Sequence, residues 1–309
     1  MKILIELPTW LGDTVMATPA IENLINHFSS SEVSFIGPSS SIELLKYHPK
    51  VSNFLVLNKK YYSLIHTAGK IGKFDNFFSF RKSLRSSAFK LFVNSSQKYQ
   101  FNKNKYPNTH LVEKYNNFIN ASINENYVPG RLLIHNKNLS NIGKSSQILG
   151  INPGASYGSS KQWYPEKFAQ VIIELSEQYE TIIFGSLAEV NFVNEIERIL
   201  IKEGIVNYRN LVGRTSISEL VDFISKLDLF ITGDSGPMHI AASFQIPTVA
   251  IFGSTRDQET SQWQNQHSKI AKKNLSCQPC MKRTCPLLHH NCMKMIESKD
   301  IISIVETIN

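Results

Sequence analysis

The chain has 309 residues, of which 42% are hydrophobic, and it carries a formal net charge of +8 with a mean hydropathy of -0.17. This length is enough for two ordinary domains with sizeable cores. No apolar run approaches the roughly 18 residues that a membrane-spanning helix needs, which argues against such a helix. Residues 1–6 contain an acid and no small-residue cleavage site, so we expect a first strand rather than a signal peptide, and a cytoplasmic protein.

The first half of the chain alternates apolar segments with amphipathic ones. We predict strands at residues 2–7, 32–37, 54–57, 74–80 and 91–94. We predict helices at residues 14–28, from Arg81 onward and at 110–119, with Pro19 kinking or delaying the first of them. Strands that alternate with helices indicate a parallel sheet in a doubly wound domain.

The pattern restarts after a polar stretch at residues 136–147, which we interpret as a linker. The predicted domains are therefore residues 1–140 and 148–309. In the second domain we predict strands at 148–152, 181–184, 229–232 and 247–252 and helices at 168–178, 191–201, 217–226 and 301–308. The chain thus consists of two similar α/β halves, each opening with an apolar strand and a glycine-containing turn.

One acid follows the first predicted strand of the chain. Asp13 comes directly after Gly12, where a helix is expected to start. This places a carboxylate at the top of the sheet, where it acts as a general base if it reaches an attacking hydroxyl. Helix capping and the helix dipole also favour an acid at this position, so the spacing alone leaves both interpretations open.

Positive charge is concentrated between positions 46 and 105, where Asp75 is the single acid. The basic residues there are Lys46, Lys50, Lys59, Lys60, Lys70, Lys73, Arg81, Lys82, Arg85, Lys90, Lys98, Lys103 and Lys105. Such a block attracts polyanions or an anionic membrane face, and a merely solvated basic surface is the alternative. Nucleic acid is a weaker interpretation, because the interleaved phenylalanines suit core packing and no nucleic-acid motif accompanies them.

The turn at residues 153–161 opens the second half and combines small and hydroxyl residues with Lys161. Its backbone amides and hydroxyls, Ser156 among them, can cradle a phosphate that the lysine neutralises. The spacing is not that of a P-loop, and an exposed loop lysine is the alternative. Glu189, after the next strand, either holds ribose hydroxyls or is an ordinary first-turn acid.

The most informative stretch is a strand, a glycine-rich turn and a helix start at residues 229–242. Asp234, Ser235 and Gly236 form the turn, and His239 follows in the helix. Backbone amides and a helix N-terminus converge there, which predicts an anion site for a nucleotide-linked ligand. Ser235 caps the helix or donates to a phosphate, and His239 is either a buried histidine or a phosphate donor. Asp234 would repel an anion, so we expect it to bond backbone N–H groups or sugar hydroxyls.

All four cysteines lie near the C-terminus, at Cys277, Cys280, Cys285 and Cys292. Stable disulfides are rare in the cytoplasm, and the first pair has the spacing of a metal-binding hairpin. A structural zinc or iron–sulfur site is therefore possible, although a second pair with that spacing is missing.

Four motifs together resemble glycosyltransferase family 9, the ADP-heptose:lipopolysaccharide heptosyltransferases. They are residues 11–13 with 17–21, residues 152–155 with 161–163, residues 232–239, and the cysteine segment, which is typical of the type II enzymes. The resemblance covers nearly the whole chain.

The resemblance implies a GT-B fold, in which two Rossmann-like domains face each other across a cleft and the helix at residues 301–308 crosses back to the first domain. It implies inverting, metal-independent transfer of L-glycero-D-manno-heptose from ADP-heptose to the first heptose of the lipopolysaccharide inner core. Asp13 would be the base and Lys161 would hold the leaving diphosphate with Ser156. Glu189 would hold the ribose, and residues 234–236 with His239 the phosphate and heptose.

The implied partners are ADP-heptose, a Kdo-lipid A core bearing one heptose, and the anionic inner face of the inner membrane, but not nucleic acid. The basic block at residues 46–105 would hold this acceptor. Alternatives are a type I or other heptosyltransferase, a nucleotide-sugar epimerase of the same fold, and a non-catalytic protein that binds polyanions or metal.

Overall fold

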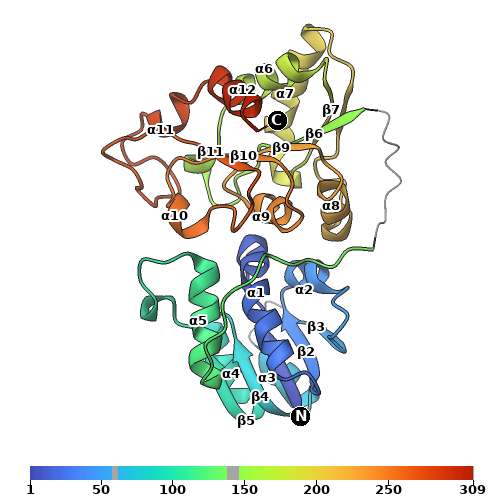
Figure 1. Ribbon diagram of the computed structural model, residues 1–309, viewed down its shortest axis with the longest axis vertical. Coiled ribbons are helices and arrows are strands. Elements are labelled where there is room, and N and C mark those ends of the chain that lie inside the picture. Colours follow the sequence, from blue (N-terminus) through green and yellow to red (C-terminus); the bar gives the residue numbers. More distant parts are fainter. Residues whose placement is uncertain (58–61, 138–145, 309) are drawn as a thin grey trace. The chain divides into compact units, whose positions relative to one another are not determined.

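Each half of the chain forms its own parallel β-sheet. The computed structural model describes residues 1–57, 62–137 and 146–308 (Figure 1). The chain divides between Lys137 and Asn138 into two compact units, here called unit 1 and unit 2. Two parallel sheets flanked by helices confirm the predicted α/β class.

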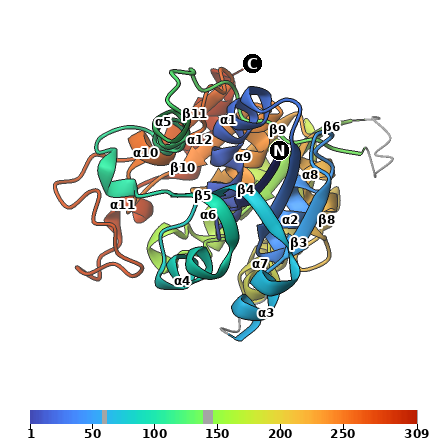
Figure 2. The same cartoon turned by 90° about the horizontal axis from the view of Figure 1, so that it is seen from below.

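Unit 1 has a five-stranded sheet in the order β3-β2-β1-β4-β5, and Figure 2 shows its strands from below. The strands are β1 (Lys2–Glu6), β2 (Glu32–Gly37), β3 (Asn53–Val56), β4 (Lys73–Ser79) and β5 (Asn94–Gln100). The helices are α1 (Leu11–His27), α2 (Ser39–Leu45), α3 (Tyr62–Lys70), α4 (Leu84–Phe92) and α5 (Leu111–Ile123), with a 3-10 turn, η1, at Lys103–Lys105.

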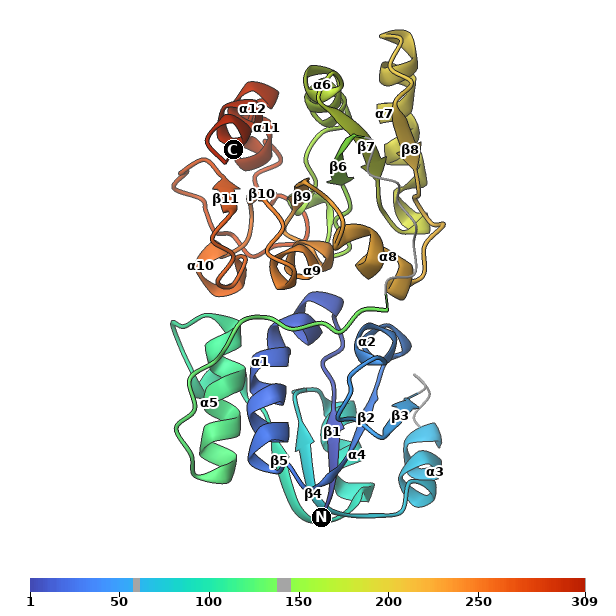
Figure 3. The same cartoon turned by 45° about the vertical axis from the view of Figure 1, so that its right-hand side comes forward.

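Alternating side chains give the sheet of unit 1 two apolar faces. Leu4 and Phe77 belong to a buried cluster with residues of α3 and α4. Phe80 points to the other face, where its ring lies 5.4 Å from that of Tyr115 and 5.6 Å from that of Phe118, both on α5. Figure 3 shows α1 and α5 side by side on that face, in agreement with their extensive contacts.

Unit 2 has a six-stranded sheet in the order β11-β10-β9-β6-β7-β8. Its strands are β6 (Gln147–Asn152), β7 (Tyr179–Ile183), β8 (Tyr208–Asn210), β9 (Leu229–Gly233), β10 (Thr248–Ile251) and β11 (Ser268–Ala271). Its helices are α6 (Pro165–Leu175), α7 (Val190–Lys202), α8 (Ile217–Ile224), α9 (Gly236–Ser243), α10 (Asp257–Thr260), α11 (Asn291–Lys294) and α12 (Ser298–Glu306), with 3-10 turns η2 (Ser159–Lys161) and η3 (Leu187–Glu189).

The core of unit 2 depends on close packing at one glycine. A large buried cluster joins one face of the sheet to α6, α7 and α12. On the other face, a Cβ at Gly150 would lie 2.3 Å from Cδ1 of Leu227 and 2.7 Å from Cδ2 of Phe230. Only a glycine in β6 therefore lets these two side chains cover the strand that positions the site.

One predicted strand in unit 1 is wrong. Residues 91 and 92 end helix α4, and strand β5 begins only at Asn94. Leu91 and Phe92 are 76% and 47% exposed, so their apolar character does not mark a buried strand. Strand β5 is a polar edge strand with no apolar alternation, which is why the hydrophobic pattern missed it.

Several helix starts also differ from the predictions. Helix α1 begins at Leu11 and continues through Pro19, so the proline does not delay it. Helix α4 begins at Leu84 rather than Arg81, because Ser83 caps it by accepting from the amide of Ser86 at 3.1 Å. Helix α6 begins at Pro165, which occupies the first turn where proline is favoured. The short elements α2, α3, β8 and β11 had no predicted counterpart.

The terminal helix packs within its own unit. Helix α12 contacts α6, β10 and β11, and Ile301 and Val305 are buried in the core of unit 2. The expected crossing back to unit 1 stays a prediction. Across residues 1–57, 62–137 and 146–308, no helix combines the length and the apolar content that crossing a bilayer requires.

Candidate active site

The predicted ligand residues of unit 2 lie where its strand order reverses. Strand β6 pairs in parallel with β7 on one side and with β9 on the other, and Asn152 is opposite Thr232. Because the chain leaves these two strands toward opposite ends of the sheet, the loops after β6 and β9 diverge. Open α/β sheets bind ligands in the crevice at such a switch point.

A small polar network fixes the turn after β9. The Asn152 amide Nδ2 donates to Thr232 Oγ1 at 3.2 Å and to Ser235 Oγ at 3.1 Å, and the two hydroxyls lie 3.0 Å apart. Ser235 is the N-cap residue of α9, but its side chain makes no capping bond to that helix. The network therefore holds the turn while the amides at the start of α9 remain available to an anion.

Lys161 and Asp234 form an ion pair at this switch point. Lys161 Nζ contacts Asp234 Oδ2 and also donates to the backbone oxygen of Asp234 at 3.4 Å. Thr255, after β10, donates to the same carboxylate oxygen at 2.6 Å. Lys161 Nζ lies 4.8 Å from the centre of the Tyr157 ring. Asp234 thus neutralises and aims the lysine, which explains an acid beside a predicted anion site.

Glu189 lies against the turn after β6. It is 7% exposed, and its Oε2 accepts from the Ser186 amide at 2.7 Å. A Cβ on Gly154 would lie 3.3 Å from Cδ of Glu189, so the carboxyl group borders this turn. Ser156 is exposed on the same turn, and His239 is buried in α9. Unit 2 therefore gathers Lys161, Asp234 and Ser235, with Glu189 bordering the turn that carries Ser156.

Asp13 is in unit 1, in the first turn of α1. The helix begins after Trp10, which makes no side-chain capping bond, so Asp13 is a first-turn acid rather than the N-cap. Its negative charge, together with burial as the larger cause, raises the pKa of Tyr115 on α5. Asp13 therefore lies close enough to Tyr115 for its charge to act on the phenol group.

The cysteine segment packs against the turn at residues 153–161. The Ser160 amide donates to the backbone oxygen of Arg283 at 3.0 Å, and Tyr157 Oη donates to that of Met281 at 2.9 Å. Gly158 has φ +153°, and a Cβ there would lie 2.3 Å from the Arg283 oxygen. The segment therefore supports the turn that carries Lys161.

The four cysteines are free thiols, and Cys292 is buried. Burial, with smaller effects from Cys280, Cys285 and Cys277, raises the pKa of the Cys292 thiol. Within the described parts of the chain, the His, Cys, Asp and Glu ligand atoms that gather in threes within 4.8 Å belong to Glu22, His48 and His135 and not to these cysteines. The predicted metal site at Cys277, Cys280, Cys285 and Cys292 stays a prediction.

Residues 79–290 match the model of glycosyltransferase family 9 (heptosyltransferase). Lipooligosaccharide heptosyltransferase 2 of Campylobacter jejuni serotype O:2 is 41% identical in sequence, over 98% of this chain and 96% of its own. The chain belongs to glycosyltransferase family 9.

Two solved structures share its fold. The E. coli ADP-heptose lipopolysaccharide heptosyltransferase II has a TM-score of 0.82 and 20% identity over 100% of this chain and 98% of its own. A family 9 glycosyltransferase of Veillonella parvula has a TM-score of 0.84 and 19% identity over 99% and 96% of the two chains.

These relatives confirm the resemblance drawn from the four motifs, and the fold is the GT-B fold of family 9 glycosyltransferases. Two polar residues of the unit 2 site, Asn152 and Thr255, were not predicted from the sequence as site residues. Asn152 is in a motif named above, and Thr255 follows the predicted strand at 247–252, but nothing in their spacing marked them as partners of Ser235 and Asp234.

In unit 1, Glu6 at the end of β1 is a further polar residue that was not predicted from the sequence. Ser79 Oγ donates to its Oε2 at 2.6 Å, Ser86 Oγ donates to the same oxygen at 2.5 Å, and Arg81 lies 3.3 Å from Oε1. Burial raises the pKa of this carboxyl against the opposing effects of both serines and of Arg81. An apolar strand context gave no sign that one of its residues would be a buried acid.

Proposed function

We propose that this family 9 glycosyltransferase transfers L-glycero-D-manno-heptose from ADP-heptose to the first heptose of the lipopolysaccharide inner core. The observation that carries the proposal is the Lys161 ammonium beside the N-terminus of α9, because Asp234 fixes the position of its N–H donors and these donors, with the helix amides, can bind a diphosphate. The names of the Campylobacter jejuni and E. coli relatives support the choice of sugar and donor.

In the donor site, Lys161, Ser156 and the first amides of α9 bind the diphosphate of ADP-heptose. Glu189 binds the ribose hydroxyls, and His239 with residues 234–236 faces the phosphate and heptose. Asp234 acts on the diphosphate through Lys161, because its carboxylate is already engaged by Lys161 and Thr255.

In the transfer step, a hydroxyl oxygen of the acceptor heptose attacks the anomeric carbon from the face opposite ADP. The bond from that carbon to the diphosphate oxygen breaks, ADP leaves with the electron pair, and Asp13 takes the hydroxyl proton. The configuration at the anomeric carbon inverts. Lys161 and the helix N-terminus offset the charge on the leaving diphosphate, so we propose that this step needs no metal ion.

The acceptor is a Kdo-lipid A core that bears one heptose, held at the inner face of the inner membrane. Helix α4 supports this placement because Leu84 and Leu91 are 89% and 76% exposed beside Lys90 and Lys98. Exposed apolar side chains with adjacent lysines suit an anionic membrane interface. Lys59 and Lys60 of the basic block lie outside the described residues.

The test of the transfer reaction is ADP release from ADP-heptose with two acceptors and in the presence of EDTA. We expect release with the acceptor that bears one heptose, none with the heptose-free acceptor, and no effect of EDTA. Release with the heptose-free acceptor alone would instead indicate a type I enzyme. Absence of release with both would contradict the proposed donor or the proposed activity.

The test of the membrane placement is co-sedimentation with vesicles that contain anionic or only zwitterionic lipids. We expect binding to the anionic vesicles, and weaker binding for Leu91→Asp, because this change puts a negative charge on the exposed apolar face of α4. Val206→Asp is the matched control, since Val206 is 87% exposed in unit 2. Equal binding of Leu91→Asp and wild type would exclude α4 as the membrane contact.

A further inference from the structure

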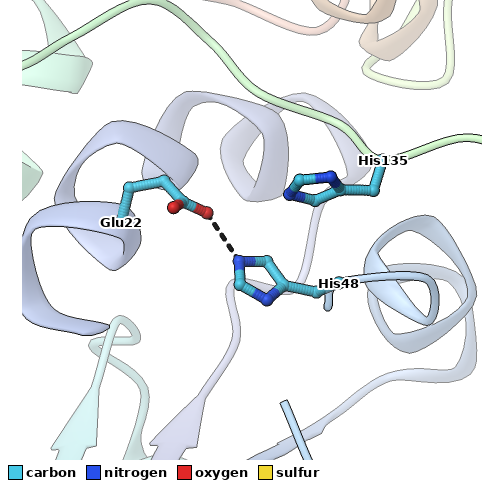
Figure 4. Close-up of side chains that lie close together, drawn as sticks. All are labelled: Glu22, His48 and His135. Atoms are coloured by element: carbon cyan, nitrogen blue, oxygen red, sulfur yellow. Dashed lines mark hydrogen bonds and ion pairs between the residues drawn. The ribbon is translucent and has the colours of Figure 1, made fainter. Parts of the chain in front are cut away.

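Unit 1 contains a cluster of metal-ligating side chains that the proposed reaction does not use. Glu22 comes from α1, His48 from the turn after α2, and His135 from the extended segment after α5 (Figure 4). One potential ligand atom from each lies within 4.8 Å of the other two. Three segments that are distant in sequence thus converge on one point.

His48 already contacts the carboxylate of this cluster. Its Nε2 lies 2.6 Å from Glu22 Oε1, and its Nδ1 accepts from the backbone amide of Lys50 at 3.2 Å. Because Nδ1 accepts, the ring proton is on Nε2 and is donated to Glu22. The side chains of His48 and Glu22 are 4% and 21% exposed, so the pair is largely shielded from water.

His135 brings a polar atom without a partner. Its Nε2 is buried and makes no hydrogen bond. The rings of His135 and His48 are 4.9 Å apart between centroids and meet edge to face at 79°. A buried imidazole nitrogen without a partner is unfavourable unless something binds it.

We propose that Glu22, His48 and His135 bind a divalent transition-metal ion of the zinc type. Two imidazole nitrogens and one carboxylate oxygen are a recognised zinc donor set, with a water in the fourth position. For Nε2 of His48 to bind the metal, the single ring proton transfers from Nε2 to Nδ1, so the imidazole stays neutral and its Nε2 lone pair is free for the metal. The Lys50 amide then gives up its 3.2 Å bond to this ring.

The metal would fasten the segment that leads from unit 1 to the linker. This segment already contacts α1, because the Leu133 amide donates to Thr18 Oγ1 at 3.0 Å and Leu132 and Ile134 are buried. A metal ion held by His135, Glu22 and His48 would also connect this segment to α1 and to the turn after α2. The role of the site is therefore to stabilise unit 1.

The experiment uses the full chain and Zn²⁺ alone, with affinity measured by competition against a chelator and stability by the melting temperature. His135→Ala and Glu22→Gln should weaken Zn²⁺ binding in unit 1 by about tenfold or more and abolish the Zn²⁺-induced rise in melting temperature. His66→Ala is the matched control, since His66 is exposed on α3, and it should behave as wild type. Circular dichroism checks that each variant is folded. If His135→Ala does not fold, Glu22→Gln alone tests the proposal.

The absorption spectrum of bound Co²⁺ distinguishes metal binding at this site from metal binding at the cysteines. Co²⁺ bound to imidazole and carboxylate shows no sulfur-to-metal charge-transfer absorption, whereas Co²⁺ on thiolates does. We expect a sulfur-free cobalt spectrum that is lost in His135→Ala and kept in His66→Ala. A spectrum with sulfur bands alone, or Zn²⁺ binding that is unchanged in both His135→Ala and Glu22→Gln, would overturn the proposal.

Discussion

The two units share one strand order over five strands, to which unit 2 adds β11 at an edge, but they have different side chains at their switch points. In unit 1, β1 and β4 bring Glu6 opposite Ser79, and the buried acid is satisfied by hydroxyls and Arg81. In unit 2, β6 and β9 bring Asn152 opposite Thr232, and a lysine is held beside a helix N-terminus. Unit 1 thus has a buried carboxyl at the end of β1, and unit 2 has an ammonium group held by an acid beside a helix N-terminus. The same strand order can therefore carry different polar side chains at its switch point, which is consistent with the different roles proposed for the two units.

The largest effect is expected at the carboxylate of unit 1. Asp13→Asn removes the proposed base, so the rate of transfer should fall by about 10²–10⁴-fold. The initial rate of ADP release at saturating ADP-heptose measures this. Glu166→Gln is the matched control, because Glu166 is also a first-turn acid, on α6, and its rate should be unchanged. A rate near wild type for Asp13→Asn would show that unit 1 does not supply the base there.

The next effect is expected at the lysine of unit 2. Lys161→Met removes a charge-assisted bond to the diphosphate, which should lower kcat/KM for ADP-heptose by roughly 10–100-fold. Lys167→Met is the control, since Lys167 also pairs with an acid, Glu297, and lies over a tyrosine ring. Equal losses in the two variants would argue that Lys161 acts through general stability and not through the donor.

Asp234→Asn tests whether the acid of unit 2 positions Lys161. If Asp234 aims Lys161, the variant should raise KM for ADP-heptose by about tenfold, an effect smaller than that of Lys161→Met. Steady-state kinetics on the single variants and on the double variant measure whether the two losses overlap. Fully additive losses would show that Asp234 and Lys161 act independently.

The support of unit 2 by the cysteine segment is tested at Gly158. Gly158→Ala puts a Cβ against the Arg283 oxygen at a φ that alanine rarely adopts, so it should destabilise the protein by about 3 kcal/mol and weaken ADP binding. Gly69→Ala is the control, because a Cβ at Gly69 on α3 meets nothing within 4 Å. Denaturant unfolding and ADP titration check both; wild-type behaviour of Gly158→Ala would mean that the turn and the segment are not coupled.

The smallest effect is a pH dependence in unit 1. The folded state raises the pKa of Glu6 above its usual 4.5, so the folded state holds this proton more tightly than the unfolded state. The contribution of Glu6 to stability is therefore fully present below pH 4.5 and decreases as pH rises through the raised value. Glu6→Gln should lower the free energy of unfolding by about 1–3 kcal/mol, because hydrogen bonds to the carboxyl are lost. The stability of this variant should no longer decrease as pH rises through the raised pKa of Glu6. Unfolding by denaturant across this pH range measures both, and an identical pH dependence in the two proteins would contradict the account.

The sequence predicted the parts of the fold that hydrophobic periodicity controls. The buried strands β1, β6 and β9 and the turns that follow them were found because their apolar runs end at glycine or polar residues. Polar or short edge strands such as β5 and β8 were missed because they have no alternating apolar face.

For the site, the sequence placed Lys161 and Asp234 in turns after two predicted strands, but it could not show that these strands are neighbours or that the two side chains form an ion pair. Thr255 and Glu6 were missed because their partners come from other strands, which only the sheet topology brings together. The cluster of Glu22, His48 and His135 was not predicted for the same reason, since more than eighty residues separate His48 from His135.

In the proposed reaction, unit 2 binds the nucleotide and unit 1 supplies the base. Calorimetric titration of ADP into wild type, Asp13→Asn and Lys161→Met tests it most directly. The account predicts nearly equal ADP affinity for wild type and Asp13→Asn and an affinity about tenfold or more lower for Lys161→Met. An ADP affinity that falls in Asp13→Asn as much as in Lys161→Met would contradict this division between the two units.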